Sequence, residues 1–269
     1  MSTDRSPTDS LARGVRGILI LGGTTEGYAL AEALSERADL RVISSLAGRT
    51  DQPRRPHGES RIGGFGGIPG LIDYLRKQRL DAVIDATHPF ASTMGWNAAA
   101  ACDALGLPRL RLERPAWQPQ PGDDWQQIDA WPAAVAALKR SGARRVLLAV
   151  GRQELAPFAA LDAVSFLIRA VSAPRPLPAF NDARLLLARG PFTLADERAL
   201  LADERIDTIV CKNSGGEATA AKLRAARELG VRVIMRQRAP RPPSAIATDV
   251  QAALAWLGTN DISASQPSD

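Results

Sequence analysis

Residues 17–30, GILILGGTTEGYAL, join an apolar run to a second apolar pattern through a short turn rich in glycine. The run Gly17–Leu21 is typical of a buried strand in a parallel sheet, where both faces of the strand are covered. The residues from Tyr28 onward have the spacing of a helix that packs back on this strand. Glycines in the turn allow positive φ and close backbone approach, and its threonines can cap the helix. The stretch therefore predicts the first strand–turn–helix unit of an α/β fold.

The turn itself is a candidate anion site, because unpaired backbone N–H groups at the start of a helix attract phosphate. A plain strand–helix turn is the alternative interpretation, and so short a motif does not decide between the two. The candidate residues for binding a dinucleotide here are Gly22, Gly23, Thr24, Thr25 and Glu26.

Strand and helix patterns alternate along almost the whole chain, which indicates parallel sheets with helices on both faces. The expected strands are 17–21, 40–46, 81–87 and 108–114 in the first half, and 143–150, 163–171, 183–190, 206–213 and 231–238 in the second. The expected helices follow the turns at 22–27, 62–67 and 151, and also cover 91–106, 193–204, 217–230 and 248–258.

A segment rich in proline and tryptophan, residues 114–132, interrupts this alternation, and we interpret it as the crossover between two halves. The predicted fold is α/β with two Rossmann-like parallel-sheet domains, 14–132 for the cofactor and 133–258 for the substrate. The polar ends 1–13 and 259–269 have the composition of disordered tails.

The composition is that of a soluble globular protein: 269 residues, 45% hydrophobic and 23% charged. A net charge of +5 suits an anionic partner. Nucleic acid is disfavoured, because there is no dense basic run and only 5% of the residues are aromatic. The N-terminus lacks the apolar core of a signal peptide, and no apolar run approaches the length of a membrane span. We expect a cytoplasmic protein with no membrane partner.

The few potential metal ligands do not form a metal-binding pattern. Cys102 and Cys211 are the only cysteines, and His57 and His88 are the only histidines. Neither pair has metal-ligand spacing, and two cysteines make no disulfide framework. No metal is expected.

The end of the second strand bears on the choice of cofactor. An NAD site expects Asp or Glu about 20 residues after the glycine turn, where it bonds the ribose hydroxyls. Here Ser44 and Ser45 occupy that region, Arg49 follows, and the first carboxylate is Asp51. Hydroxyls and an arginine suit a ribose 2′-phosphate, so NADPH is the expected cofactor. Arg49 as an ordinary loop residue is the alternative.

The motif DATHPFA, residues 85–91, places Thr87 and His88 directly after a buried strand, and Pro89 fixes the start of the next helix. Thr87 and His88 are therefore candidates for contact with the cofactor. His88 is also the candidate proton donor, although it could instead serve only to hold its loop together.

The second half repeats the strand–glycine turn–helix design in VCKNSGGEATAAKLRAA, residues 210–226. Its strand end gathers donors suited to carboxylates or phosphate, and arginines after two other strands are placed comparably. The candidate substrate-binding residues are Arg152, Arg189, Lys212, Asn213, Ser214, Gly215 and Gly216.

Several enzyme classes are excluded by the absence of their motifs. Short-chain reductases need a Lys four residues after a Tyr, whereas Tyr28 and Tyr74 are followed at that spacing by Glu32 and Gln78. There is no Gly-x-Ser-x-Gly nucleophile motif, and GGTTEG lacks the Gly-Lys-Ser/Thr ending of a P-loop.

Taken together, the motifs of this chain resemble the precorrin-6A reductases of corrin-ring (vitamin B12) biosynthesis. The resemblance runs from about residue 17 to about residue 257 and rests on ILILGGTTEGYALAEAL (18–34), SSLAGRT (44–50), DATHPFA (85–91), RPAW (114–117), VGRQEL (150–155), RGPF (189–192), CKNSGGEATAAKLRAARELG (211–230) and VRVIMRQRAP (231–240). One departure is Ala218, near which many relatives have a glycine; the helix start is left intact.

The resemblance implies NADPH-dependent reduction of one double bond of a tetrapyrrole precursor to give precorrin-6B, with the ligands in a cleft between two Rossmann-like halves. The carboxylate arms of such a macrocycle would suit Lys212, Arg152 and Arg189.

Three alternatives remain open, the first from the resemblance and the other two from the residues. The family includes reductases of the cobalt-loaded precursor, some of which prefer NADH. A nucleotide- or S-adenosylmethionine-dependent transferase would more often keep an acidic residue where Ser44 and Ser45 stand. A non-catalytic dinucleotide sensor would not need the anion-binding turns of the second half.

Overall fold

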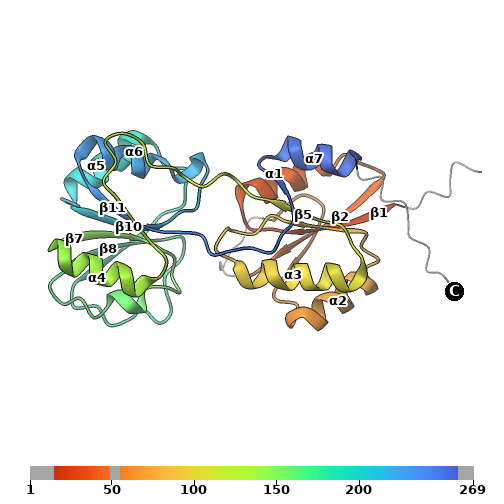
Figure 1. Ribbon diagram of the computed structural model, residues 1–269, viewed down its shortest axis with the longest axis horizontal. Helices are drawn as coiled ribbons and strands as arrows, with labels where there is room; N and C mark the ends of the chain where they lie inside the picture. The colour runs from red at the N-terminus through yellow and green to blue at the C-terminus, as the bar shows by residue number, and fades with distance from the viewer. Residues whose placement is uncertain (1–14, 49–54, 260–269) are drawn as a thin grey trace, which may run out of the picture. The chain divides into compact units, whose positions relative to one another are not determined.

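The structure is a computed structural model that describes residues 15–48 and 55–259. The chain divides into two compact units: unit 1 takes residues from 1–114 and 241–269, and unit 2 comprises residues 115–240 (Figure 1). The predicted tail 1–13 lies outside the described residues, and so does the predicted tail 259–269 apart from Thr259, which ends a helix.

Unit 1 is built on a six-stranded sheet in which every neighbouring pair is parallel. The strand order is β12 (Ala245–Ala247), β5 (Arg109–Leu112), β4 (Ala82–Asp85), β1 (Arg16–Leu21), β2 (Leu40–Leu46) and β3 (Glu59–Ile62). Helices α1 (Thr25–Leu34) and α7 (Val250–Thr259) cover one face, and α2 (Gly67–Lys77) and α3 (Ser92–Leu105) cover the other (Figure 1).

Unit 2 has a second six-stranded sheet, also parallel throughout. Its order is β6 (Trp125–Ile128), β11 (Arg232–Arg236), β10 (Thr208–Lys212), β7 (Arg145–Ala149), β8 (Ser165–Ala170) and β9 (Ala183–Leu187). Helix α4 (Trp131–Ser141) and the 3₁₀ turn η2 (Ala156–Phe158) pack on one face. Helices α5 (Leu194–Asp203) and α6 (Ala221–Leu229) pack on the other, with the 3₁₀ turn η3 (Glu217–Thr219) just before α6 (Figure 1).

The sandwiching of each sheet explains the continuous apolar runs of the sequence. Along β1, Ile18 and Ile20 belong to the core under α1 and α7, whereas Leu19 and Leu21 belong to the core under α2 and α3. All four side chains are at most 2% exposed. Burial on both faces is the property expected of a central parallel strand, and it confirms the predicted fold class.

The division of the chain differs from the predicted boundary after residue 132. Strand β6 belongs to the sheet of unit 2, so unit 2 begins at Pro115 rather than at residue 133. Strand β12 and helix α7 return to unit 1, so the predicted second domain ends too late in the sequence. Unit 1 is therefore discontinuous in sequence.

Two further local differences concern η2 and α4. The expected helix after Gly151 is only the 3₁₀ turn η2, in which Pro157 stands near the start and Phe158 is fully buried. Helix α4 was not anticipated, because its first turn overlaps the proline-rich crossover.

Among the described residues, no helix combines the length and the apolar character needed to cross a membrane.

Candidate functional site

The glycine turn follows β1 at the carboxyl edge of the sheet in unit 1. The Gly22 N–H donates to the Ser45 carbonyl at 2.9 Å, which ties the turn to the end of β2. Gly23 has a φ of +114°, and a Cβ placed there would have no other described heavy atom within 4 Å. The turn thus combines a glycine backbone with open space beside it, as a phosphate site requires.

Thr24 and Gly27 fix where α1 starts. Thr24 Oγ1 accepts a hydrogen bond from the Gly27 N–H at 3.2 Å and donates to the Ala86 carbonyl at 2.8 Å. A Cβ at Gly27 would lie 3.3 Å from the Ala86 Cβ, so a small residue lets the helix approach the end of β4. The cap and the close approach hold the helix start against two strand ends.

Of the other two predicted residues of this turn, Thr25 is exposed and Glu26 is paired within unit 1. Arg114 Nη1 donates to Glu26 Oε2 at 2.7 Å, and the two side chains are 16% and 22% exposed. The carboxylate is thereby neutralised beside a turn that is proposed to bind an anion.

At the end of β2, the two predicted serines face opposite sides of the sheet. Ser44 is 1% exposed, and its Oγ has no hydrogen-bond partner among the described residues. Ser45 Oγ accepts a hydrogen bond from Arg61 Nη1 at 2.8 Å. Arg49 lies outside the described residues. Arg61, on the neighbouring strand β3, was not identified from the sequence.

The end of β4 carries a buried network around Asp85. Thr87 Oγ1 donates to Asp85 Oδ1 at 2.6 Å, and Arg241 Nη2 donates to Asp85 Oδ2 at 2.5 Å. The Arg241 and Asp85 side chains are only 6% and 2% exposed. Arg241 Nη1 also donates to the Pro89 carbonyl at 3.2 Å. Arg241 therefore holds both ends of the loop that contains His88.

His88 lies half-buried in this loop, with its ring 5.8 Å from that of Phe90. Its Nδ1 accepts a hydrogen bond from the Phe90 N–H at 3.2 Å. In the neutral imidazole this contact leaves the proton on Nε2.

In unit 2, the ends of β10 and β11 place two cations around one carboxylate. Lys212 Nζ pairs with Glu154 Oε2, and Arg236 Nη1 donates to Glu154 Oε1 at 2.9 Å. Trp131 Nε1 also donates to Glu154 Oε1, at 3.1 Å. The three charged side chains keep between 16% and 27% of their exposure. We call Lys212, Glu154 and Arg236 the cationic cluster, since its formal net charge is +1.

The turn after Lys212 is held by the crossover segment. Asn213 is 2% exposed, and its Oδ1 accepts from the Trp117 N–H at 2.8 Å while its Nδ2 donates to the Trp117 carbonyl at 3.0 Å. A Cβ at Gly215 would lie 2.2 Å from the Pro115 carbonyl oxygen, so this close approach requires glycine. The Gly216 carbonyl accepts from Trp117 Nε1 at 3.0 Å. Asn213 thus fastens the turn, and its amide is already engaged.

The remaining predicted residues stand on neighbouring loops. Ser214 is half-buried, and its carbonyl accepts from Arg238 Nη2 at 3.1 Å. Arg152 is half-buried and donates from Nη1 to Ser172 Oγ at 3.1 Å. Arg189 is exposed, and its loop contacts the turn after Gly216 because the Phe192 N–H donates to the Ala218 carbonyl at 3.3 Å.

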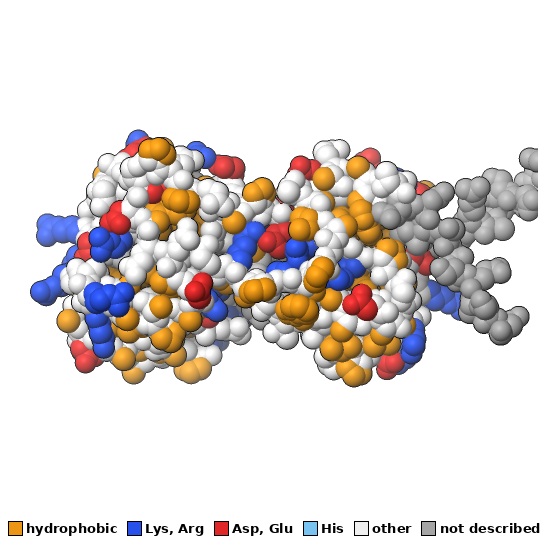
Figure 2. Space-filling view, viewed as in Figure 1, with side chains coloured by type: hydrophobic (Ala, Val, Ile, Leu, Met, Phe, Trp, Pro, Cys, Tyr) orange, Lys and Arg blue, Asp and Glu red, His pale blue; other side chains and the backbone are white. Residues whose placement is uncertain are grey.

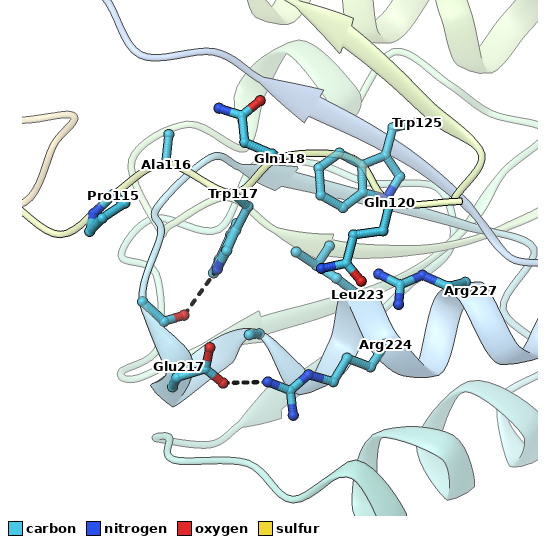
Figure 3. Close-up of a pocket in the computed structure, with 12 residues that line it drawn as sticks. Pro115, Ala116, Trp117, Gln118, Gln120, Trp125, Glu217, Leu223, Arg224 and Arg227 are labelled. Atoms are coloured by element: carbon cyan, nitrogen blue, oxygen red, sulfur yellow. Dashed lines mark hydrogen bonds and ion pairs between the residues drawn. The ribbon is translucent and has the colours of Figure 1, made fainter. Parts of the chain in front are cut away.

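Unit 2 also has a cavity of about 510 Å³ beside this turn, at the start of α6 (Figure 3). Figure 3 shows Trp117 and Trp125 on the crossover side and Glu217 paired with Arg224 on the side of η3 and α6. The lining residues are Pro115, Ala116, Trp117, Gln118, Gln120, Trp125, Gly216, Glu217, Ala220, Leu223, Arg224 and Arg227.

The cysteines are not suited to catalysis at neutral pH. Cys102 and Cys211 are both buried and free. Burial raises the pKa of the Cys102 thiol to about 12 and raises the pKa of Cys211 in the same direction. Within the described ranges, no group of three or more His, Cys, Asp or Glu side chains could hold a metal ion.

The basic side chains of unit 2 do not form a continuous band on the face drawn in Figure 2. Its Lys and Arg side chains lie there in small groups separated by uncharged and hydrophobic surface.

Comparison with known proteins identifies close relatives over most of the chain. Residues 17–258 match the family described as precorrin-6x reductase CbiJ/CobK. The precorrin-6A reductase of Rhodococcus erythropolis is 49% identical over 244 residues, which are 90% of this chain and 97% of that protein. A cobalt-precorrin-6A reductase of Priestia megaterium is 27% identical over 81% of this chain and 89% of its own length.

A solved structure has a closely similar fold over most of the chain. The structure titled CobK precorrin-6A reductase superposes with a TM-score of 0.86 at 42% sequence identity, covering 91% of this chain and 96% of that one.

Proposed function

Because this chain belongs to the precorrin-6x reductase CbiJ/CobK family, we propose that it reduces one double bond of precorrin-6A with NADPH and so forms precorrin-6B in cobalamin biosynthesis. The observation that supports this most is that one chain carries two different strand-end sites. Unit 1 has an open glycine turn with the features of a dinucleotide site, and unit 2 has the cationic cluster.

The residues of unit 1 fit a nicotinamide dinucleotide. The open space at Gly23 and the backbone amides at the start of α1 would receive the pyrophosphate, and the buried Ser44 hydroxyl would find a partner in a bound ribose. When bound, NADPH supplies the hydride for the reduction. We assign the 2′-phosphate end to the region of Ser44, Ser45 and Arg49, because the sequence there offers hydroxyls and a cation and no carboxylate.

Unit 2 would hold the carboxylate arms of the macrocycle. Lys212, Arg152 and Arg189 supply cations, and the Ser214 hydroxyl with the amides of Gly215 and Gly216 supplies neutral donors. Asn213 would act indirectly, since its amide holds the Trp117 backbone and so fixes the turn. Several such contacts fix the orientation of a planar substrate, which is the main requirement of hydride transfer between two rings.

His88 is our candidate for the proton donor. Reduction of a double bond adds a hydride to one carbon and a proton to the other. Because the Phe90 N–H occupies His88 Nδ1, the proton would leave from Nε2, and solvent water would return a proton to the ring. Arg241 and Asp85 would keep this loop in place, and Thr87 would stay with Asp85 beside the cofactor.

The metal-free precursor is favoured over the cobalt-loaded one. Identity to a precorrin-6A reductase is 49%, against 27% to a cobalt-precorrin-6A reductase. A single-turnover assay tests both points: the purified protein is mixed with precorrin-6A or its cobalt form and with NADPH or NADH, and absorbance of the nicotinamide and the macrocycle is followed. We expect fastest oxidation of NADPH with precorrin-6A. Faster turnover with the cobalt form and NADH would select the alternative reductase, and no nicotinamide oxidation with either precursor would favour a transferase or a sensor.

A further inference from the structure

We propose that Arg61 reads the 2′-phosphate of NADPH and thereby sets the preference of this protein for NADPH over NADH. The proposal rests on the proposed use of a nicotinamide dinucleotide at the glycine turn of unit 1. Arg61 stands on β3, a four-residue edge strand, and β3 pairs with β2 in a register that places Ser45 opposite Arg61.

The position of Arg61 in the sheet is the first argument. In a dinucleotide fold the pyrophosphate lies at the turn after the first strand, and the ribose of the adenosine lies over the end of the neighbouring strand. That neighbouring strand is β2. Arg61 contacts the end of β2, because Arg61 Nη1 donates to Ser45 Oγ at 2.8 Å. The guanidinium is therefore at the strand end where the ribose hydroxyls are read.

The second argument is charge. Arg61 is half-buried, and within the described ranges it has no carboxylate partner. Arg41, which stands earlier on β2, is instead paired with Glu59 of β3 at 2.8 Å. An arginine without a counter-ion at a strand end is suited to a phosphate, which guanidinium binds through paired N–H donors.

The third argument is rigidity. Nη1 also donates to the Gly63 carbonyl at 2.9 Å, and Nη2 donates to the Gly64 carbonyl at 2.8 Å. The guanidinium carbon lies 4.0 Å from the centre of the Phe65 ring and 5.1 Å from that of Tyr74. These contacts hold the cation in one orientation before any ligand arrives, which lowers the entropy that binding must overcome.

An apolar surface lies next to this cation. Ile62 is 56% exposed although it ends a strand, and its Cγ2 would lie 3.0 Å from a Cβ at Gly48. A cation beside an open aliphatic side chain and a glycine matches the adenosine 2′-phosphate group, which combines a flat apolar base with two negative charges.

Titration calorimetry with the full-length protein tests the proposal. The ligands are NADPH, NADH and 2′,5′-ADP, and the variants are Arg61→Gln, Arg61→Lys and the control Arg41→Gln. We expect wild type to bind NADPH more tightly than NADH. Arg61→Gln should lose about tenfold or more in affinity for NADPH and 2′,5′-ADP while NADH binding changes little, as expected for loss of a charge-assisted contact. Arg61→Lys should keep part of the preference, and Arg41→Gln should keep all of it.

The preference of wild type should also decrease as salt is added, because the contact is ionic. If Arg61→Gln and Arg61→Lys weaken NADPH and NADH equally, Arg61 only supports its loop and the proposal is overturned. An unchanged NADPH preference in Arg61→Gln overturns it too. If wild type prefers NADH, the proposal fails while turnover of precorrin-6A with NADH still supports the reductase; absence of binding to either nucleotide would instead contradict the proposed function itself.

Discussion

Glu154 gives the cationic cluster its particular charge. Its carboxylate is shared by Lys212 and Arg236 and also accepts from Trp131 Nε1. Two cations on one carboxylate leave the strand end positive and hold both cations in defined places. A carboxylate arm of a substrate would therefore meet preoriented donors, at the cost of competing with Glu154 for them.

Replacement of Lys212 tests this arrangement. Lys212→Ala should lower kcat/KM for precorrin-6A by about tenfold at low salt, the effect of losing one ionic contact, and by less at high salt, where screening weakens it. The dissociation constant for NADPH should stay the same. Lys139→Ala removes an exposed lysine of α4 and serves as the control. A loss of NADPH binding with normal use of precorrin-6A would mean that the roles of the two units are reversed.

A second prediction at the scale of single residues concerns the reactivity of the two cysteines. Cys102 and Cys211 are 0% and 1% exposed, and burial raises the pKa of both thiols, that of Cys102 to about 12. The native protein at pH 8 should therefore react only slowly with a disulfide reagent such as DTNB, and two thiols should react at once in denaturant. Rapid modification of one thiol in the native protein would show that its burial is transient.

At the scale of single elements, the turn between β1 and α1 offers a substitution that should weaken NADPH binding without lowering the stability of the protein. Gly22 is the useful position, because a Cβ there would make only ordinary contacts, 3.5 Å to Leu46 Cδ2 and 3.8 Å to the Ser45 carbonyl oxygen. Gly22→Ala should keep the melting temperature within a few degrees of that of wild type. It should lower the affinity for NADPH by about tenfold, because the added methyl group obstructs close approach of the pyrophosphate. Calorimetry and thermal melts measure the two effects. Unchanged NADPH affinity in a stable variant would remove the pyrophosphate from this turn.

The end of β4 is expected to behave in the opposite way, because its ion pair is buried. Arg241→Gln leaves Asp85, which is 2% exposed, without its charged partner, and such a loss costs about 3–5 kcal/mol. Amides of β4 and α3 should then exchange faster with deuterium in mass spectrometry. Arg37→Gln, which breaks an exposed pair with Asp39, should change exchange in unit 1 by far less. Equal protection in both variants would contradict a structural role for Arg241.

The strands that sequence patterns did not predict share one property: all three lie at sheet edges. Strands β3, β6 and β12 each have a single neighbour. An edge strand is less covered, so β3 reads ESRI and β6 reads WQQI rather than as apolar runs. Central strands such as β1 and β10 were predicted because both of their faces are buried.

The same distinction between central strands and other positions applies to the residues of the candidate sites. The glycine turn and His88 follow central strands and Lys212 ends one, and their motifs were visible in the sequence. Arg61 was missed because it lies on the edge strand β3, which has no apolar run. Arg241 was missed because it stands 156 positions from its partner Asp85 in the sequence. The contact between Arg241 and Asp85 depends on the return of the chain to unit 1, which local patterns do not encode. The engagement of Asn213 by Trp117 is hidden because the two residues stand 96 positions apart in the sequence.

At the scale of the whole molecule, the two units differ in how the chain builds them. Unit 2 is one continuous segment, 115–240, with its own cores on both faces of the sheet. Unit 1 needs the C-terminal segment, because β12 pairs with β5 and α7 places Ala253 and Leu257 in the core beside Leu30 and Leu34. These two α7 side chains are at most 3% exposed.

Fragments should therefore behave unequally. Residues 115–240 should fold alone, with a cooperative thermal transition and near-UV circular dichroism from fixed tryptophans, since a continuous segment with its own core is an independent domain. A chain ending at residue 240 should keep this transition but lose the one from unit 1, together with NADPH binding, because the core under α1 would be uncovered.

Joining residues 1–114 to 241–269 through a flexible Gly/Ser linker restores all strands of the first sheet. This chain should fold and bind NADPH with the affinity of the full-length protein, while it should not bind precorrin-6A, because Lys212 and the other predicted substrate contacts are absent. Calorimetry with both ligands measures this. Binding of NADPH by the chain that ends at residue 240 would show that unit 1 forms its nucleotide site without β12 and α7, and precorrin-6A binding by the joined chain would place substrate recognition in unit 1.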